Sequence, residues 1–176
     1  MLCISLIHAQ VRFGVKGGLN FENFRLKDAK ELSIANSAGW QLGGLLQFKV
    51  PIVNIGVQPE LLYTVKNAKV EEKEEKETNS IHYFELPLNV RWSLNFAVVR
   101  PFLTGGPYLN YAVKTEGGIF ETQINKLDWG IGLGGGVEMW NLQLGARYSW
   151  GMQNISKAAD FEIKNNTFTV SLAYLF

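Results

Sequence analysis

The sequence alternates apolar and polar residues in eight separate segments, and this pattern constrains the fold more than any other feature. Successive side chains of a β-strand point to opposite faces, so each segment predicts a strand with one apolar and one polar face. The predicted strands lie near residues 10–21, 39–50, 55–66, 81–93, 99–114, 127–140, 142–152 and 166–176. We find no convincing amphipathic helical stretch, so the fold is predicted to be all-β.

The connections between the predicted strands alternate in length. Long polar connections cover roughly residues 22–38, 67–80, 115–126 and 153–165, whereas short ones lie at 51–54, 93–98 and 140–141. Eight antiparallel strands give four long loops and three short turns when both termini lie on the short-turn side. This is the pattern of an eight-stranded, up-and-down transmembrane β-barrel.

The segment LDWGIGLGGGVEMW, residues 127–140, contains a motif that resembles a nucleotide site. Gly130, Gly132 and Gly135 have the G-x-G-x-x-G spacing of a dinucleotide-binding fingerprint. That motif works only where the glycines lead from a strand into a helix whose N-terminal amides hold the pyrophosphate. Here the alternation continues through the glycines to Met139 and no helix is predicted, so we set the nucleotide interpretation aside.

Alternation alone fits two barrels, an outer-membrane barrel and a soluble lipocalin-like carrier of apolar ligands, because exchanging the two faces leaves the pattern unchanged. Glycine favours the first. An eight-stranded barrel has an interior just wide enough for side chains, so glycines on the polar face make room for long Arg and Glu side chains. The glycines in question are Gly130, Gly132, Gly134 and Gly136. On a soluble barrel they would face water, where nothing offsets their entropic cost.

Aromatic residues at the predicted strand ends favour the membrane barrel as well. Trp40, Trp129 and Trp150 fall near long loops, and Trp92 and Trp140 near short turns. A tilted strand rises about 25 Å from position 129 to position 139, the height of an outer-membrane apolar band. We therefore expect two interfacial girdles, with buried core tryptophans as the alternative. Phe176 ends an alternating last strand that resembles the signal for barrel-assembly machinery.

The composition limits other classes of function. A hydrophobic content of 47% with a net charge of +1 excludes a disordered or strongly basic chain and argues against nucleic acid as a partner. We expect residues 1–9, MLCISLIHA, to be the residual part of a signal peptide, with an ordinary apolar N-terminus as the alternative, and residues 10–176 to form the barrel domain. The only cysteine, Cys3, lies in that leader.

Four prolines fall within predicted strands: Pro59, Pro87, Pro101 and Pro107. A closed barrel has no free edge where a missing amide would be harmless. We therefore expect bulges or local breaks in the hydrogen-bond ladder at these positions.

The predicted inner face carries both signs of charge. Its charged residues are Arg12, Lys16, Glu60, Lys66, Glu85, Arg91, Arg100, Asp128, Glu138 and Arg147. Unpaired charges in so narrow an interior would cost several kcal/mol each, so we predict acid–base pairs that fill and plug the lumen. A gated, narrow path for ions or small solutes is the alternative.

Catalytic and cofactor sites have little support. His82, the only histidine of the predicted mature chain, lies near a long loop, where we expect a solvated or interfacial side chain. No Ser/His/Asp spacing, metal-ligand cluster or catalytic carboxylate pair is evident, so we expect neither an enzyme nor a cofactor. The charged run EEKEEKE, residues 71–77, is expected to form a solvated loop tip, with lipopolysaccharide contact as an alternative.

The segments VRFGVKGGLNF, IGVQPELLYT, HYFELPLNVRW, RPFLTGGPYLNY and FTVSLAYLF resemble the PorT-type outer-membrane β-barrel family of Bacteroidota. The resemblance covers nearly all of residues 11–176, including the prolines inside strands. It implies a location in the bacterial outer membrane, among lipid and lipopolysaccharide. One branch of that family takes part in protein secretion by the type IX pathway, so envelope or secretion proteins are further expected partners.

Overall fold

The computed structural model describes residues 10–26, 34–35, 38–50, 54–72, 75–94, 96, 98–116, 127–152 and 163–176. The strands are β1 (Gln10–Leu26), β2 (Ile34–Ala35), β3 (Ala38–Val50), β4 (Ile55–Glu72), β5 (Glu75–Ser93), β6 (Val99–Glu116), β7 (Leu127–Met139), β8 (Leu142–Gly151) and β9 (Ile163–Leu175). No described segment is a helix long and apolar enough to cross a membrane. The predicted signal peptide at residues 1–9 lies outside the described residues.

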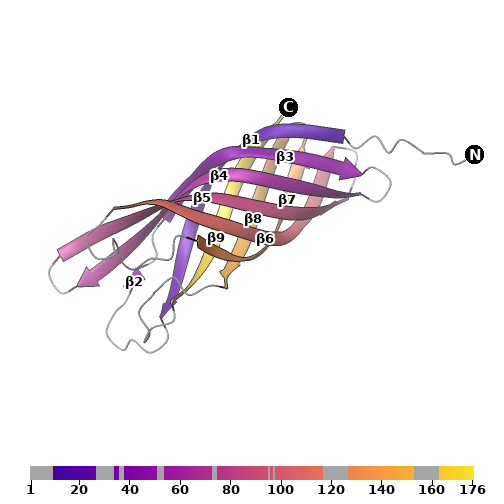
Figure 1. Ribbon diagram of the computed structural model, residues 1–176. Helices are drawn as coiled ribbons and strands as arrows, with labels where there is room; N and C mark the ends of the chain where they lie inside the picture. The colour runs from indigo at the N-terminus through magenta and orange to yellow at the C-terminus, as the bar shows by residue number, and fades with distance from the viewer. Residues whose placement is uncertain are drawn as a thin grey trace, which may run out of the picture.

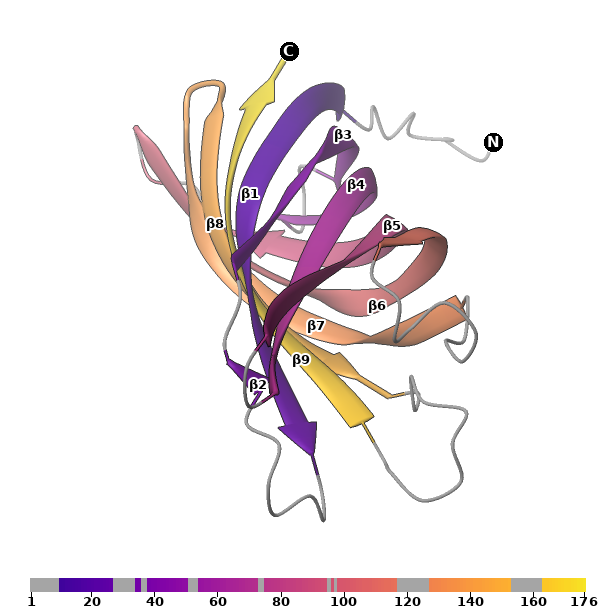
Figure 2. The same cartoon turned by 90° about the vertical axis from the view of Figure 1, so that its left-hand side faces the viewer.

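Eight of the strands close into an antiparallel barrel. Each long strand pairs with its neighbours in sequence, β1 pairs with β9, and β4 pairs with β5, while the short β2 adds to β4 alone. Figure 1 shows the tilted strands from the side, and Figure 2 shows them curving around a common interior. The predicted eight-stranded up-and-down barrel is confirmed.

The first and last strands are held together at the chain's C-terminus. The amide of Phe176 donates a hydrogen bond to the carbonyl oxygen of Phe13 at 2.8 Å, and the two rings stack with centroids 4.9 Å apart. Asn141 of the tight turn between β7 and β8 accepts a hydrogen bond from the amide of Leu175 at 2.7 Å. In this turn Trp140 has a φ of 52°, the left-handed backbone that two-residue hairpins often require.

The barrel is apolar outside and polar inside. Buried side chains are mostly polar or charged, whereas large apolar side chains such as Phe13, Leu61, Leu133 and Leu172 are more than half exposed. A soluble protein has the opposite distribution, because each large apolar side chain left in water forgoes about 1.5–3 kcal/mol. This outer surface suits lipid, and the soluble-carrier alternative is wrong.

One predicted long loop is wrong: much of residues 67–80 is strand. Beyond the barrel, β4 and β5 continue as a two-stranded hairpin, in which Ala68 pairs with Asn79 and Glu72 with Glu75. This projecting hairpin is visible in Figure 1 with β2 beside it. Residues 71–72 and 75–77 of the run EEKEEKE therefore lie in paired strands instead of in an irregular loop.

The prolines interrupt pairing without shifting the register. Ladder pairs are missing beside Pro59, Pro87 and Pro107, yet the pairs on either side of each gap keep the same register. The prediction of local breaks holds at these three positions, whereas the ladder between β6 and β7 is continuous through Pro101. The register shift between β5 and β6 instead lies between His82 and Tyr83. It places Lys114 opposite His82, and Lys114 is exposed.

Candidate functional site in the barrel lumen

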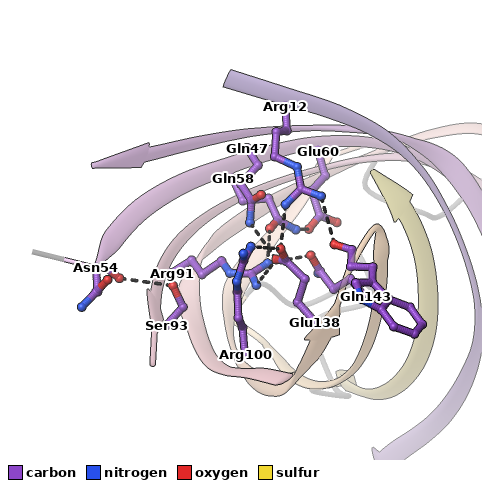
Figure 3. A network of polar contacts seen from close by, with 11 residues as sticks. Arg12, Gln47, Asn54, Gln58, Glu60, Arg91, Ser93, Arg100, Glu138 and Gln143 are labelled. Atoms are coloured by element: carbon purple, nitrogen blue, oxygen red, sulfur yellow. Dashed lines mark hydrogen bonds and ion pairs between the residues drawn. The ribbon is translucent and has the colours of Figure 1, made fainter. Parts of the chain in front are cut away.

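A dense cluster of ionic contacts lies at the short-turn end of the lumen, around Glu138 near the end of β7. Its Oε1 accepts hydrogen bonds from Arg12 Nη1 at 2.6 Å and Arg100 Nη1 at 3.3 Å. Its Oε2 accepts from Arg91 Nη2 at 2.5 Å and Gln47 Nε2 at 3.4 Å. Figure 3 shows these side chains converging from separate strands. One carboxylate is thus shared by three guanidinium groups.

Arg91 is the most enclosed of the three guanidinium groups in this cluster. Its side chain is 3% exposed, and its Nη1 donates to Gln143 Oε1 at 2.6 Å and to Gln58 Oε1 at 3.2 Å. The guanidinium also lies over the Phe102 ring, 3.9 Å from its centroid, in a cation–π contact. Arg91 therefore links β4, β5, β7 and β8 across the interior.

A second ion pair lies deeper in the lumen. Lys16 Nζ is 2.7 Å from Glu60 Oε2, and both side chains are less than a tenth exposed. The other oxygen of Glu60 accepts hydrogen bonds from Gln58 Nε2 at 2.8 Å and Asn89 Nδ2 at 3.1 Å. Both oxygens of this buried carboxylate have partners, as a buried charge requires.

Three predicted charges are held by neutral groups in the contacts that the structure shows. Arg147 donates to Asn89 Oδ1 and to the carbonyl oxygen of Gly106. Glu85 accepts from Thr64 at 3.5 Å, and Asp128 accepts from Asn110 at 3.4 Å. Neutral amide, hydroxyl and carbonyl groups therefore also contact the luminal charges.

Toward the long-loop end, Lys66 lies among polar and aromatic groups. Its Nζ is 3.2 Å from Thr167 Oγ1 and 5.6 Å from the centroid of the Tyr83 ring. It is 5% exposed and interacts electrostatically with Asp128, which is 3% exposed. Each predicted luminal charge is therefore inside the barrel or, as with Arg100, at its mouth.

Sequence reasoning missed the role of amides and aromatics. Gln47, Gln58, Asn89 and Gln143 join the charged residues to one another, and Phe102 fills space among them. Strand parity places all of these residues on the polar face, and this parity is the sequence signal that could have identified them. Their partners lie on strands distant in sequence, so alternation alone does not pair them.

The glycines of β7 make room for one arginine and two aromatic side chains. A Cβ at Gly132 would meet the guanidinium of Arg147, one at Gly130 the Tyr108 ring, and one at Gly136 the Phe102 ring. The prediction of space for arginine therefore holds at Gly132, whereas aromatic rings lie beside Gly130 and Gly136.

A small cavity lies in the middle of the lumen. Its volume is about 20 Å³, and it is lined by residues that include Lys16, Glu60, Asn89 and Arg147. This volume suits one water molecule. Among the described residues, no three His, Cys, Asp or Glu side chains gather as metal ligands.

The predicted girdle residues lie on the outer surface. The exposed fractions are Trp40 45%, Trp92 46%, Trp129 47%, Trp140 73%, Trp150 40% and Phe176 55%. His82 is partly buried on the same side, where the Tyr63 hydroxyl lies 2.8 Å from its Nδ1. Aromatic side chains at both ends of an apolar surface are typical of transmembrane β-barrels.

The fold, the apolar exterior and the polar lumen define an integral outer-membrane β-barrel protein. The family model described as an outer membrane protein beta-barrel domain matches residues 8–157. The chain belongs to this family, and its location is the bacterial outer membrane. Because such barrels have short periplasmic turns, the short-turn end faces the periplasm and the long-loop end faces outward. A comparison with curated proteins finds no match.

Solved outer-membrane barrels have the same fold. The outer membrane protein OprG from Pseudomonas aeruginosa is 11% identical with a TM-score of 0.62, and 96% of this chain and 97% of that one are covered. Neisserial surface protein A is 14% identical with a TM-score of 0.56, covering 93% and 97%. Ail of Yersinia pestis, solved with the heparin analogue sucrose octasulfate, is 16% identical with a TM-score of 0.52, covering 95% and 99%.

Proposed function

We propose that this protein is a plugged outer-membrane barrel that acts structurally or by interaction through its outward-facing surface. The supporting observation is the cross-lumen network in which Arg91 and Glu138 connect five strands of the barrel, β1, β4, β5, β7 and β8. The small volume of the central cavity, about 20 Å³, supports a lumen that is closed to hydrated ions. The lumen then serves as a rigid core that holds the outward-facing elements in place.

The β4–β5 hairpin is the element best placed for an interaction. It continues past the pairing of β5 with β6, which begins at Ser80, and past the pairing of β3 with β4, which begins at Trp40 opposite Val65. Its sequence carries the EEKEEKE run, which presents both signs of charge. A partner in the envelope, including a secretion protein, belongs to this proposal on the strength of the PorT-type resemblance.

Planar-bilayer recording tests the plug. We expect the purified wild-type protein to give no steady single-channel steps, and Arg147→Ala to stay silent because the network around Glu138 still closes the periplasmic end. A heat-dependent gel-mobility shift of the reconstituted protein shows that silence does not reflect failed insertion. Steady, ion-selective steps from the wild type would contradict the proposal and favour the narrow pore.

A trimmed variant tests the interaction surface. Replacing residues 69–78 by Asn-Gly closes the hairpin at the Ala68–Asn79 pair with a two-residue turn that favours hairpins. We expect the barrel to keep its mobility shift while crosslinked adducts of the wild-type protein in intact cells disappear. Unchanged adducts would exclude the hairpin as the contact surface.

A further inference from the structure

The charges of the lumen are unevenly distributed along the barrel. Away from the periplasmic end, the positive and negative charges of the described luminal side chains are equal in number. The cations there are Lys16, Lys66 and Arg147, and the anions are Glu60, Glu85 and Asp128. The periplasmic mouth has four cations, Arg12, Lys49, Arg91 and Arg100, and one anion, Glu138. The whole luminal excess of three positive charges is therefore at one end.

Glu138, the one carboxylate among the described side chains of the mouth, has no free hydrogen-bond acceptor site. Glu138 accepts four hydrogen bonds, two at each oxygen, which uses the acceptor sites of a carboxylate. Lys49, near the end of β3, interacts electrostatically with Arg12, Arg91, Arg100 and Glu138. Lys49 is therefore repelled by three cations and attracted by one carboxylate.

Hydrogen-bond donors remain in this cluster. The side chain of Arg91 is 97% buried, and its Nε makes no hydrogen bond. The side chain of Arg100 is 46% exposed, and its contact with Glu138 uses one of the five N–H donors of a guanidinium. Arg12 is 23% exposed and reaches the carbonyl oxygen of Trp140 at 3.3 Å. Solute from the periplasm can therefore reach the cluster.

We propose that the periplasmic mouth binds a phosphate-type oxyanion through Arg100, Arg12 and Lys49. Guanidinium groups bind phosphate through charge-assisted, often paired hydrogen bonds, and an anion here relieves the repulsion among the cations. The group comes from free phosphate in the periplasm or from the headgroup of an inner-leaflet phospholipid. This proposal does not depend on whether the lumen conducts ions, because oxyanion binding at equilibrium is measured without any conductance recording.

Titration calorimetry with inorganic pyrophosphate as the probe tests the site in neutral detergent micelles. We expect saturable binding that weakens as sodium chloride rises from 0.05 to 0.5 M, because salt screens the partly exposed cations. Arg100→Gln should weaken binding about tenfold or more, in line with the loss of a charged hydrogen bond, whereas Arg100→Lys should keep most of it. Lys114→Gln, an exposed cation at the other end of the barrel, is the matched control.

Nanodiscs separate the two sources. If a lipid headgroup occupies the mouth, pyrophosphate affinity should be lower in phosphatidylglycerol discs than in phosphatidylcholine discs. Arg100→Gln should then abolish that difference. Equal affinity in the two kinds of disc would assign the site to the free anion. Absence of saturable binding by heat-shifted, folded protein in micelles would overturn the proposal. An equal loss of affinity in Arg100→Gln and Lys114→Gln would overturn it as well.

Discussion

The guanidinium group of Arg147 occupies the space that a side chain at Gly132 would need. A Cβ added at Gly132 would clash with the Nε, Cζ and Nη2 atoms of Arg147. Arg147 in turn donates hydrogen bonds to Asn89 and to the carbonyl oxygen of Gly106. The entropic cost of glycine in a strand is therefore offset by a filled polar lumen.

Gly132→Ala should displace Arg147 and lower the free energy of unfolding by about 1–3 kcal/mol, the usual cost of overfilling a packed interior. Urea unfolding in detergent measures the change. In an Arg147→Ala background the same substitution should cost much less, because the clashing group is gone. Equal costs in both backgrounds would show that the two residues do not compete for space.

Gly44→Ala is the matched control for this experiment. The nearest atom to a Cβ at Gly44 is the carbonyl oxygen of Gly14 at 3.7 Å, an ordinary contact, and Gly44 is exposed on the outer face. We expect no loss of stability there, since alanine reduces the entropy of the unfolded chain.

Glu138→Gln should be among the most damaging single substitutions in the lumen. It removes the charge that Arg12, Arg91 and Arg100 share and leaves buried Arg91 among like charges. Removing one partner of a buried ion pair lowers the free energy of unfolding by about 3–5 kcal/mol. The thermal midpoint of the gel-mobility shift should fall accordingly, whereas exposed Lys114→Gln should stay within about 0.5 kcal/mol of the wild type.

Lys16 and Glu60 should show strong coupling in a double-mutant cycle. Lys16→Met leaves a buried carboxylate without its cation, and Glu60→Gln leaves a buried ammonium without its anion. Each single variant should lose about 3–5 kcal/mol, while the double variant loses clearly less than the sum. Additive losses in urea unfolding would mean that the pair contributes little as a pair.

Strand parity predicted the faces of the barrel well because one period of two residues governs every strand. Arg91 and Glu138 were placed inside from alternation alone, and the structure has them 3% exposed. Their contact was not predictable in the same way. It joins β5 to β7, and the heights at which distant strands meet depend on the tilt and stagger of the whole barrel.

The β4–β5 hairpin shows a different limit. Glu and Lys are depleted in strands, so the run at residues 71–77 reads as a loop. In the structure the two strands continue into it, with Glu71 opposite Lys76 and Val70 opposite Glu77. The pairing of β4 with β5 inside the barrel continues outward here and outweighs the low strand propensity of Glu and Lys. This effect comes from tertiary structure and cannot be read from composition.

The lipid-facing surface makes the sharpest depth-dependent prediction. Leu133 lies midway along β7 and is 56% exposed, whereas Met139 ends the same strand and is 38% exposed. Leu133→Arg should cost about 2–4 kcal/mol, because it puts a charge at the bilayer midplane, and Met139→Arg should cost about 0–1 kcal/mol near the interface. Unfolding of the two variants from phospholipid bilayers measures the difference. Equal, small costs at both positions would mean that β7 does not cross the hydrocarbon core with this face outward.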